Sequence, residues 1–270
     1  NKHDKTGAGK RMKARRAAVA GMFYPADKAV LERTVSGLLA AAPASSDSAK
    51  AIIAPHAGYQ YSGFTAACAY RLLEDRRKLI RKVVLLGPAH RVYLRGMALP
   101  SADTFTTPLG DVQVDMEAVE RALSLPGTQV SDEAHADEHS LEVHLPFLQI
   151  VLEDFQIVPI VVGNCPAHEV ESVISALWGG DETLIVVSSD LSHFHAYDLA
   201  REIDASTTAR IEARDATLHG EDACGACAVN GLLLAATSQG LQVRTLDTRN
   251  SGDTAGDKSR VVGYGAYAIA

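Results

Sequence analysis

Short runs of Val, Ile and Leu alternate along this chain with longer stretches whose apolar residues recur at helical spacing. Four runs are nearly continuous in apolar residues, which is typical of strands buried on both faces of a sheet: 51–54, 82–86, 155–162 and 183–188. The stretches with helical spacing are 62–74, 139–153, 166–178 and 199–214. This alternation predicts an α/β fold in which helices cover both faces of a layered, mostly parallel sheet.

Two further segments predict strands of another kind. Residues 96–115 hold the turn sequence PLGD at 108–111 between short alternating runs, which predicts a small β-ribbon insert. Residues 261–269 carry Gly263 and Gly265 at alternate positions. Glycines placed in this way indicate a last strand that another backbone approaches closely.

The first 16 residues are strongly basic, although the whole chain is acidic. They hold seven Lys and Arg against the single acid Asp4, whereas the chain has 26 Lys and Arg, 33 Asp and Glu, and a net charge of −7. With nothing apolar interleaved, this composition predicts a flexible tail over residues 1–15, part of which could be non-native. No Pro/Ser-rich linker interrupts residues 16–270, which we expect to form one domain.

Several classes of protein are excluded by what the sequence lacks. A general nucleic-acid binder would need a basic face, which an acidic chain does not favour. Gly58 and Gly63 match neither the phosphate-loop nor the dinucleotide spacing, so we expect no nucleotide cofactor. The apolar stretch after Arg16 is too short for a signal peptide, and no run approaches the ~20 residues of a membrane helix. We therefore expect no nucleic-acid and no membrane partner.

The cysteine content favours a reducing compartment. Four cysteines in 270 residues do not make a disulfide scaffold, so we expect a cytoplasmic protein. Cys68 and Cys165 lie in apolar contexts and are interpreted as inert core residues.

A histidine follows each of three predicted strands. His56 comes after the first strand, His90 after the second, and His193 after the strand that ends at Ser188. In open α/β sheets, ligands bind at the carboxyl ends of parallel strands. If these strands are neighbours, the three imidazoles meet at one edge, where they could bind a transition metal.

Such a metal site needs an anionic ligand, for which the sequence offers three candidates. Cys224 precedes an expected helix, whose dipole would lower the pKa of the thiol. Asp190 and Glu142 are the alternatives. Cys224 also forms a C-x-x-C pair with Cys227, but a single pair of this kind is weak evidence for zinc or for thiol redox chemistry. We expect one functional thiol, Cys224, and a packed Cys227.

The segment DEHSLEVHLP at residues 137–146 supplies further polar side chains. On a helix His139 and Glu142 share a face while His144 points elsewhere, which is not the arrangement of zinc proteases. We interpret these three residues as neighbours that line the pocket or position the ligands, rather than as ligands themselves.

Five ordered motifs together resemble the Memo-like family, known in prokaryotes as AmmeMemoRadiSam system protein B. They are GMFYP at 21–25, IIAPHAGY at 52–59, GPAH at 87–90, the segment at 137–146, and SSDLSH at 188–193. The family resembles the LigB-type class III extradiol dioxygenases, which bind non-haem Fe(II) through two histidines and a carboxylate. By position, the resemblance implies that His56 and His90 are metal ligands, that Cys224 replaces the carboxylate, and that His193 is the acid/base.

Two functions remain open. The first is a redox enzyme with Fe(II), or another transition metal such as Cu or Zn, acting on a small aromatic or phenolic substrate. In it His193, oriented by Asp190, moves the proton, while Tyr59 and Tyr61 line the mouth of the pocket. The second is a binding module in which the same pocket accepts a peptide or a protein without turnover. For that case the resemblance implies radical SAM and AMMECR-type protein partners.

Overall fold

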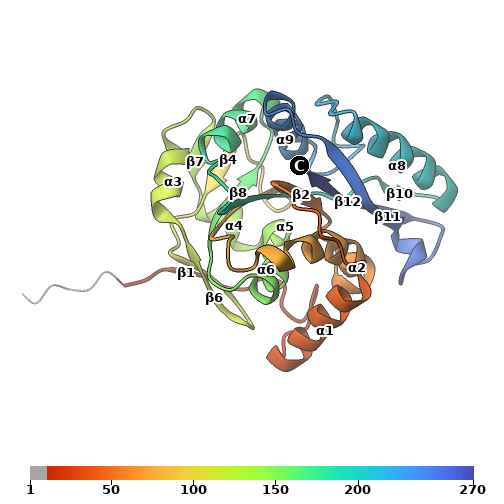
Figure 1. Cartoon of the computed structure of the whole chain (residues 1–270), viewed down its shortest axis with the longest axis horizontal. Coiled ribbons are helices and arrows are strands. Elements are labelled where there is room, and N and C mark those ends of the chain that lie inside the picture. Colours follow the sequence, from red (N-terminus) through yellow and green to blue (C-terminus); the bar gives the residue numbers. More distant parts are fainter. Residues whose placement is uncertain (1–10) are drawn as a thin grey trace, which may run out of the picture.

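The computed structural model describes residues 11–270 and is built around a 12-stranded sheet (Figure 1). Its main path runs β1-β5-β6-β8-β3-β9-β2-β12-β10, while β11 pairs with β12, and β4 pairs with β7 and β8. The strands are β1 (Ala14–Arg15), β2 (Ala51–Ala54), β3 (Lys82–Pro88), β4 (Met97–Leu99), β5 (Thr104–Thr107), β6 (Gly110–Val114), β7 (Thr128–Val130), β8 (Gln156–Val162), β9 (Thr183–Ser188), β10 (His193–His195), β11 (Val243–Asn250) and β12 (Val261–Ile269).

The centre of the sheet consists of the four apolar runs that the sequence singles out. Strands β8, β3, β9 and β2 are adjacent and parallel, with Lys82 of β3 opposite Thr183 of β9, and Ala51 of β2 opposite Ile185 of β9. Almost every side chain in them is buried, because helices cover both faces. Three strands that precede a histidine, β3, β9 and β2, are thus direct neighbours.

The helices form two layers, one on each face of the sheet (Figure 1). Helices α1, α2, α5 and α6 lie on one face, and α7, α8 and α9 lie on the other, where α9 packs on α7, β3 and β9. The helices are α1 (Lys28–Ala41), α2 (Tyr59–Tyr70), α3 (Met116–Leu123), α4 (Asp132–Ala136), α5 (His139–Glu142), α6 (Leu145–Val151), α7 (Ala167–Ala176), α8 (Tyr197–Glu212) and α9 (Ala226–Ser238), with 3-10 turns η1 (Arg71–Arg76) and η2 (Ser251–Asp253). This architecture confirms the predicted fold class.

The prediction of a single helix over residues 139–153 is wrong in detail. The structure divides it into α5 and α6, with Pro146 in the first turn of α6. Proline lacks the N–H that a continuous helix would need there, and its ring clashes with the preceding turn. None of the helices in the described part of the chain is both long and apolar enough to cross a membrane.

The two unusual strand segments form as predicted, with one correction for the ribbon. Strands β5 and β6 make the antiparallel ribbon, but β6 also pairs with β8, so the ribbon extends the main sheet. In β12 another backbone approaches Gly263 closely, as predicted, because its N–H donates to the carbonyl of Ser192 at 2.9 Å and its carbonyl accepts the N–H of Leu191 at 2.8 Å. Side chains also leave no room for a Cβ at either glycine. A Cβ on Gly263 would lie 1.9 Å from the carboxylate of Asp204, and one on Gly265 would lie 2.4 Å from the hydroxyl of Tyr267.

The ordered domain begins earlier in the chain than predicted. Residues 1–10 of the expected tail lie outside the described residues, but β1 pairs in parallel with β5, and Arg15 is buried. The boundary placed before residue 16 is therefore wrong. The basic side chain of Arg15 is inside the protein because a buried carboxylate, Glu142, is its partner.

Candidate metal centre

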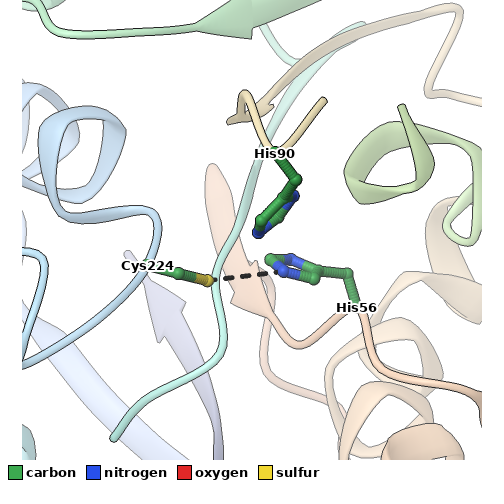
Figure 2. A group of neighbouring side chains, drawn as sticks. All are labelled: His56, His90 and Cys224. Atoms are coloured by element: carbon green, nitrogen blue, oxygen red, sulfur yellow. Dashed lines mark hydrogen bonds between the residues drawn. The ribbon is translucent and has the colours of Figure 1, made fainter. Parts of the chain in front are cut away.

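Three histidines lie at the edge where the central parallel strands end. His56 lies just past β2, His90 just past β3, and His193 begins β10 after the loop from β9. A fourth side chain, Cys224, reaches this edge from the loop that precedes α9, and Figure 2 shows it pointing at His56 and His90. The Sγ atom of Cys224 is 3.4 Å from Nε2 of His56. One ligand atom from each of His56, His90 and Cys224 falls within 4.8 Å of the others.

The hydrogen bonds of His56 assign its proton to Nδ1. Its Nδ1 is 2.7 Å from Oγ of Ser188, and that hydroxyl donates its own proton to the carbonyl of Ser140 at 2.7 Å. Ser188 must therefore accept from His56, because a hydroxyl has one proton to give. Burial lowers the pKa of His56, and the electrostatic effect of the nearby His90 lowers it further. The ring is therefore neutral, and the lone pair of Nε2 faces Cys224.

His90 is oriented in the same sense by a carboxylate. Oε1 of Glu138 lies 2.8 Å from Nδ1 of His90, and Oε2 accepts the backbone N–H of His90 at 2.5 Å. Burial raises the pKa of Glu138, but hydrogen bonds from the side chain and backbone of His90 outweigh it and lower that pKa to about 2. The ionised carboxylate accepts the Nδ1 proton and orients the ring, so Nε2 is the nitrogen that remains to bind a cation.

Sequence reasoning gave Glu138 no role, although a signal was present. Glu138 is the N-cap of α5, and its side chain accepts the backbone N–H of Ser140 at 3.0 Å. An acidic residue at a helix start directly before a polar helix end indicates a fixed carboxylate. What the sequence does not reveal is that His90, 48 residues away, lies within its reach.

The expected property of Cys224 is contradicted by its surroundings. Cys224 precedes Gly225, the N-cap of α9, as predicted, but burial and then the charge of Asp190 raise the pKa of the thiol to about 12. The helix dipole does not dominate, so the predicted low thiol pKa is wrong. A cation bound here would have to displace the thiol proton, which makes its affinity depend on pH.

The other cysteines stay apart from this chemistry. All four cysteines are free, and Cys227 lies on α9, partly buried against the core. Burial raises the pKa of Cys68 to about 11 and that of Cys165 to about 12, which agrees with inert core residues.

Asp190 and His193 do not form the pair that the sequence suggested. Asp190 accepts the backbone N–H of His56 at 2.8 Å, and its Oδ2 is 3.7 Å from Nε2 of His56. His193 instead has Nδ1 2.9 Å from the carbonyl of Leu191. The carbonyl accepts a proton from Nδ1, so the backbone orients the ring of His193.

A cavity of about 410 Å³ opens beside these side chains. His139, Asp190, His193 and Tyr61 are among its lining residues. The ring of His139 is stacked on His90, with centroids 4.6 Å apart. A small molecule in this cavity would therefore contact both His193 and the neighbourhood of the three candidate ligands.

Three of the residues expected to line the pocket or to position the ligands do not line this cavity. Tyr59, whose hydroxyl donates to the carbonyl of Val143 at 2.6 Å, lines a neighbouring groove rather than this cavity. Glu142 is bound to the N-terminal segment and is not near the candidate ligands. His144 lies behind Ser188, with Nε2 2.8 Å from its Oγ.

Two buried histidines make the stability of the fold depend on pH. Burial lowers the pKa of His144 to about 3 and that of His135 to about 4. As the pH falls below about 6.5, the unfolded chain takes up protons that the folded protein refuses, so stability is lost towards acid. We expect His144 alone to lower the free energy of unfolding by about 2 kcal/mol between pH 8 and pH 5.

Urea unfolding at these two pH values measures the effect. In His144→Gln the difference between pH 8 and pH 5 should shrink by about 2 kcal/mol, whatever the stability of the variant at pH 8. The exposed His168 on α7 supplies the control, because His168→Gln should leave the difference as it is. An undiminished difference in His144→Gln would show that His144 is not a buried neutral imidazole.

The donor set fits a transition metal. Two imidazole nitrogens and one sulfur are soft or borderline metal ligands, which Mg²⁺ and Ca²⁺ do not favour. A second grouping, His90 with Glu138 and His139, has the same spacing, but the 2.8 Å contact from Glu138 already occupies Nδ1 of His90. The side chain of His90 is 29% exposed, so the first group is open to solvent on that side.

Fold and site together define an α/β protein with a candidate two-histidine, one-cysteine metal centre at the carboxyl edge of its parallel strands. The model of the Memo-like protein family matches residues 15–268, which is nearly the whole chain. The chain therefore belongs to the Memo-like family.

Relatives from bacteria and archaea agree with this assignment. A MEMO1 family protein of Aquifex aeolicus is 39% identical over 94% of this chain and 98% of its own. Another from Archaeoglobus fulgidus is 36% identical over 93% of this chain and 97% of its own. A crystal structure of an uncharacterized protein from Escherichia coli K12 shows a weaker likeness, with a TM-score of 0.47 and 14% identity over 79% of this chain and 98% of that one.

Proposed function

We propose that this chain is a cytoplasmic non-haem iron protein with dioxygenase-like redox activity on a small aromatic or phenolic substrate. One observation carries the proposal. A ring nitrogen of His56, a ring nitrogen of His90 and the sulfur of Cys224 lie within 4.8 Å of one another, beside a cavity of about 410 Å³. Lone pairs that are held towards a common point, with each opposite nitrogen fixed by an acceptor, favour cation binding.

His56, His90 and Cys224 would hold Fe(II), which would supply one-electron chemistry with open positions for small ligands. The same donors also suit Cu or Zn. Glu138 and Ser188 would keep the two rings in the orientation that ligation needs.

His193 would hold or move the proton of the substrate. It lines the cavity, and the carbonyl of Leu191 fixes its proton on Nδ1, so its Nε2 is the basic atom. Tyr61 lines the same cavity and offers an aromatic face to a ring-shaped substrate. Asp190 would act on the backbone of His56 rather than on His193.

Replacing His193 separates metal binding from chemistry. In His193→Ala the iron content and the stability should match the wild type, while turnover found in a screen of catechols and phenols should fall about 10²–10⁴-fold. His195, two residues further along β10, does not line the cavity, so His195→Ala should retain turnover. Lowered stability with full activity in His193→Ala would contradict the acid/base role.

A second function is favoured by a larger groove next to the cavity. This groove of about 670 Å³ shares Phe23, Gly58 and Tyr61 with the cavity and is also lined by Met22, whose exposed fraction is 74%. An exposed apolar groove suits a peptide or a partner protein, such as those of the radical SAM and AMMECR types. Protein isolated without iron, with no turnover in the screen, would favour this binding module over the enzyme.

A further inference from the structure

A chain of hydrogen bonds runs from His56 into the core, away from the cavity. Nδ1 of His56 is 2.7 Å from Oγ of Ser188, which is 2.8 Å from Nε2 of His144. Nδ1 of His144 is in turn 2.7 Å from the hydroxyl of Tyr70. Ser188, His144 and Tyr70 are fully or almost fully buried, so no solvent competes for these contacts.

Only one distribution of protons satisfies every group in this chain. Ser188 gives its proton to the carbonyl of Ser140, so both of its lone pairs face N–H donors, one from His56 and one from His144. His144 then has an unprotonated Nδ1, which accepts the hydroxyl proton of Tyr70. A protonated His144 would leave the buried hydroxyl proton of Tyr70 without a partner.

The chain opposes a competing arrangement of His56. Oδ2 of Asp190 lies 3.7 Å from Nε2, close enough to draw the ring proton to that nitrogen. A proton on Nε2 would block the lone pair that faces Cys224. It would also deprive Ser188 of one of its two N–H donors.

We propose that Ser188 and His144, held in place by Tyr70, are positioning residues that keep the proton of His56 on Nδ1 and so make Nε2 a metal ligand. The role of Nε2 of His56 as a metal ligand rests on the proposed metal site, whereas the position of the proton does not. His90 needs no such chain, because an ionised carboxylate holds its Nδ1 proton directly. His56 depends instead on a neutral hydroxyl, whose direction the neighbouring groups must set.

The position of the proton is measured by ¹⁵N NMR of histidine-labelled protein stripped of metal with a chelator. In the wild type the neutral His56 ring should carry its proton on Nδ1, and in Ser188→Ala a population protonated on Nε2 should appear. Ser192 is the matched control. It is a buried serine on the loop after β9 whose hydroxyl has no partner among the described residues, so Ser192→Ala should leave His56 unchanged.

Titration with Co²⁺, followed by sulfur-to-cobalt charge-transfer absorption, measures the consequence for the metal site. Ser188→Ala should weaken binding by about 10–100-fold, and Tyr70→Phe should weaken it less, in the same direction. The ring of Tyr70 stays stacked on Phe147 in that variant, with only the hydroxyl removed. Tyr267→Phe, which removes a buried hydroxyl bonded to Thr208 instead, should not change the Kd.

An unchanged His56 ring and an unchanged Kd in Ser188→Ala would overturn the proposal. If Ser188→Ala does not fold, Tyr70→Phe decides, because equal Co²⁺ affinity in Tyr70→Phe and Tyr267→Phe would show that the chain is only structural. Wild-type protein without charge-transfer absorption would refute the proposed metal site, whereas a shift of the His56 proton to Nε2 in Ser188→Ala would still support the role of Ser188 in placing that proton.

Discussion

Protein loaded with Fe(II) under argon is expected to bind about one iron per chain, and His56→Ala or His90→Ala is expected to abolish that binding. The candidate centre has three protein ligands, so the loss of one leaves too few donors to compete with water. Equilibrium dialysis followed by iron analysis gives the stoichiometry.

His168→Ala serves as the control for these ligand variants. His168 is exposed on α7 and belongs to neither grouping of candidate ligands, so this variant should bind as much iron as the wild type. Full iron occupancy in His56→Ala or in His90→Ala would show that the ligands have been assigned incorrectly.

The second large effect is expected at Glu142, which fastens the N-terminal segment to the core. Its fully buried carboxylate pairs with Arg15 and accepts the backbone N–H groups of Ala18 at 2.6 Å and Val19 at 2.9 Å, together with the hydroxyl of Tyr24 at 2.8 Å. Glu142→Ala would leave a buried guanidinium uncompensated. We expect a loss of about 3–5 kcal/mol in the free energy of unfolding, measured with urea.

An exposed ion pair provides the control for the stability loss expected in Glu142→Ala. Glu153 is 3.5 Å from Arg77 at the surface, so Glu153→Ala should cost no more than about 1 kcal/mol. Glu142 binds the segment at Arg15, Ala18, Val19 and Tyr24, so limited proteolysis of Glu142→Ala should cut near residues 15–24 first. Equal stability losses in the two variants would contradict the role of Glu142 as a buried anchor.

The sequence was informative about the central sheet for a physical reason. A strand that is buried on both faces must be apolar at every position, so β2, β3, β8 and β9 stand out without any knowledge of their neighbours. Parallel neighbours then bring their carboxyl ends to one edge, which is why the loops after them could be recognised as a site.

The direction in which a side chain points was much harder to predict. Helical periodicity places Glu142 and His139 on one face, but α5 is only four residues long, and Glu142 turns to a segment more than 100 residues earlier in the chain. Tyr59 begins α2 near the site, yet its hydroxyl is bound to Val143 on a different element. Contacts of this kind depend on packing between distant segments, which no local pattern records.

The predicted pKa of Cys224 and the predicted partner of Asp190 were wrong for a related reason. A helix start predicted a low pKa for Cys224, but the effect of desolvation depends on everything that surrounds the sulfur, including Asp190. Asp190 itself lies three residues before His193, yet it accepts from His56, because adjacent parallel strands bring the two loops together.

The most direct test of a two-histidine, one-cysteine centre is X-ray absorption at the iron edge, on protein loaded with Fe(II) under argon. The wild type should show one sulfur scatterer together with imidazole scattering from His56 and His90, and Cys224→Ser should lose the sulfur while the imidazole signal remains. A wild-type spectrum with only oxygen and nitrogen neighbours, or one that Cys224→Ser does not change, would contradict the assignment of Cys224 as a ligand.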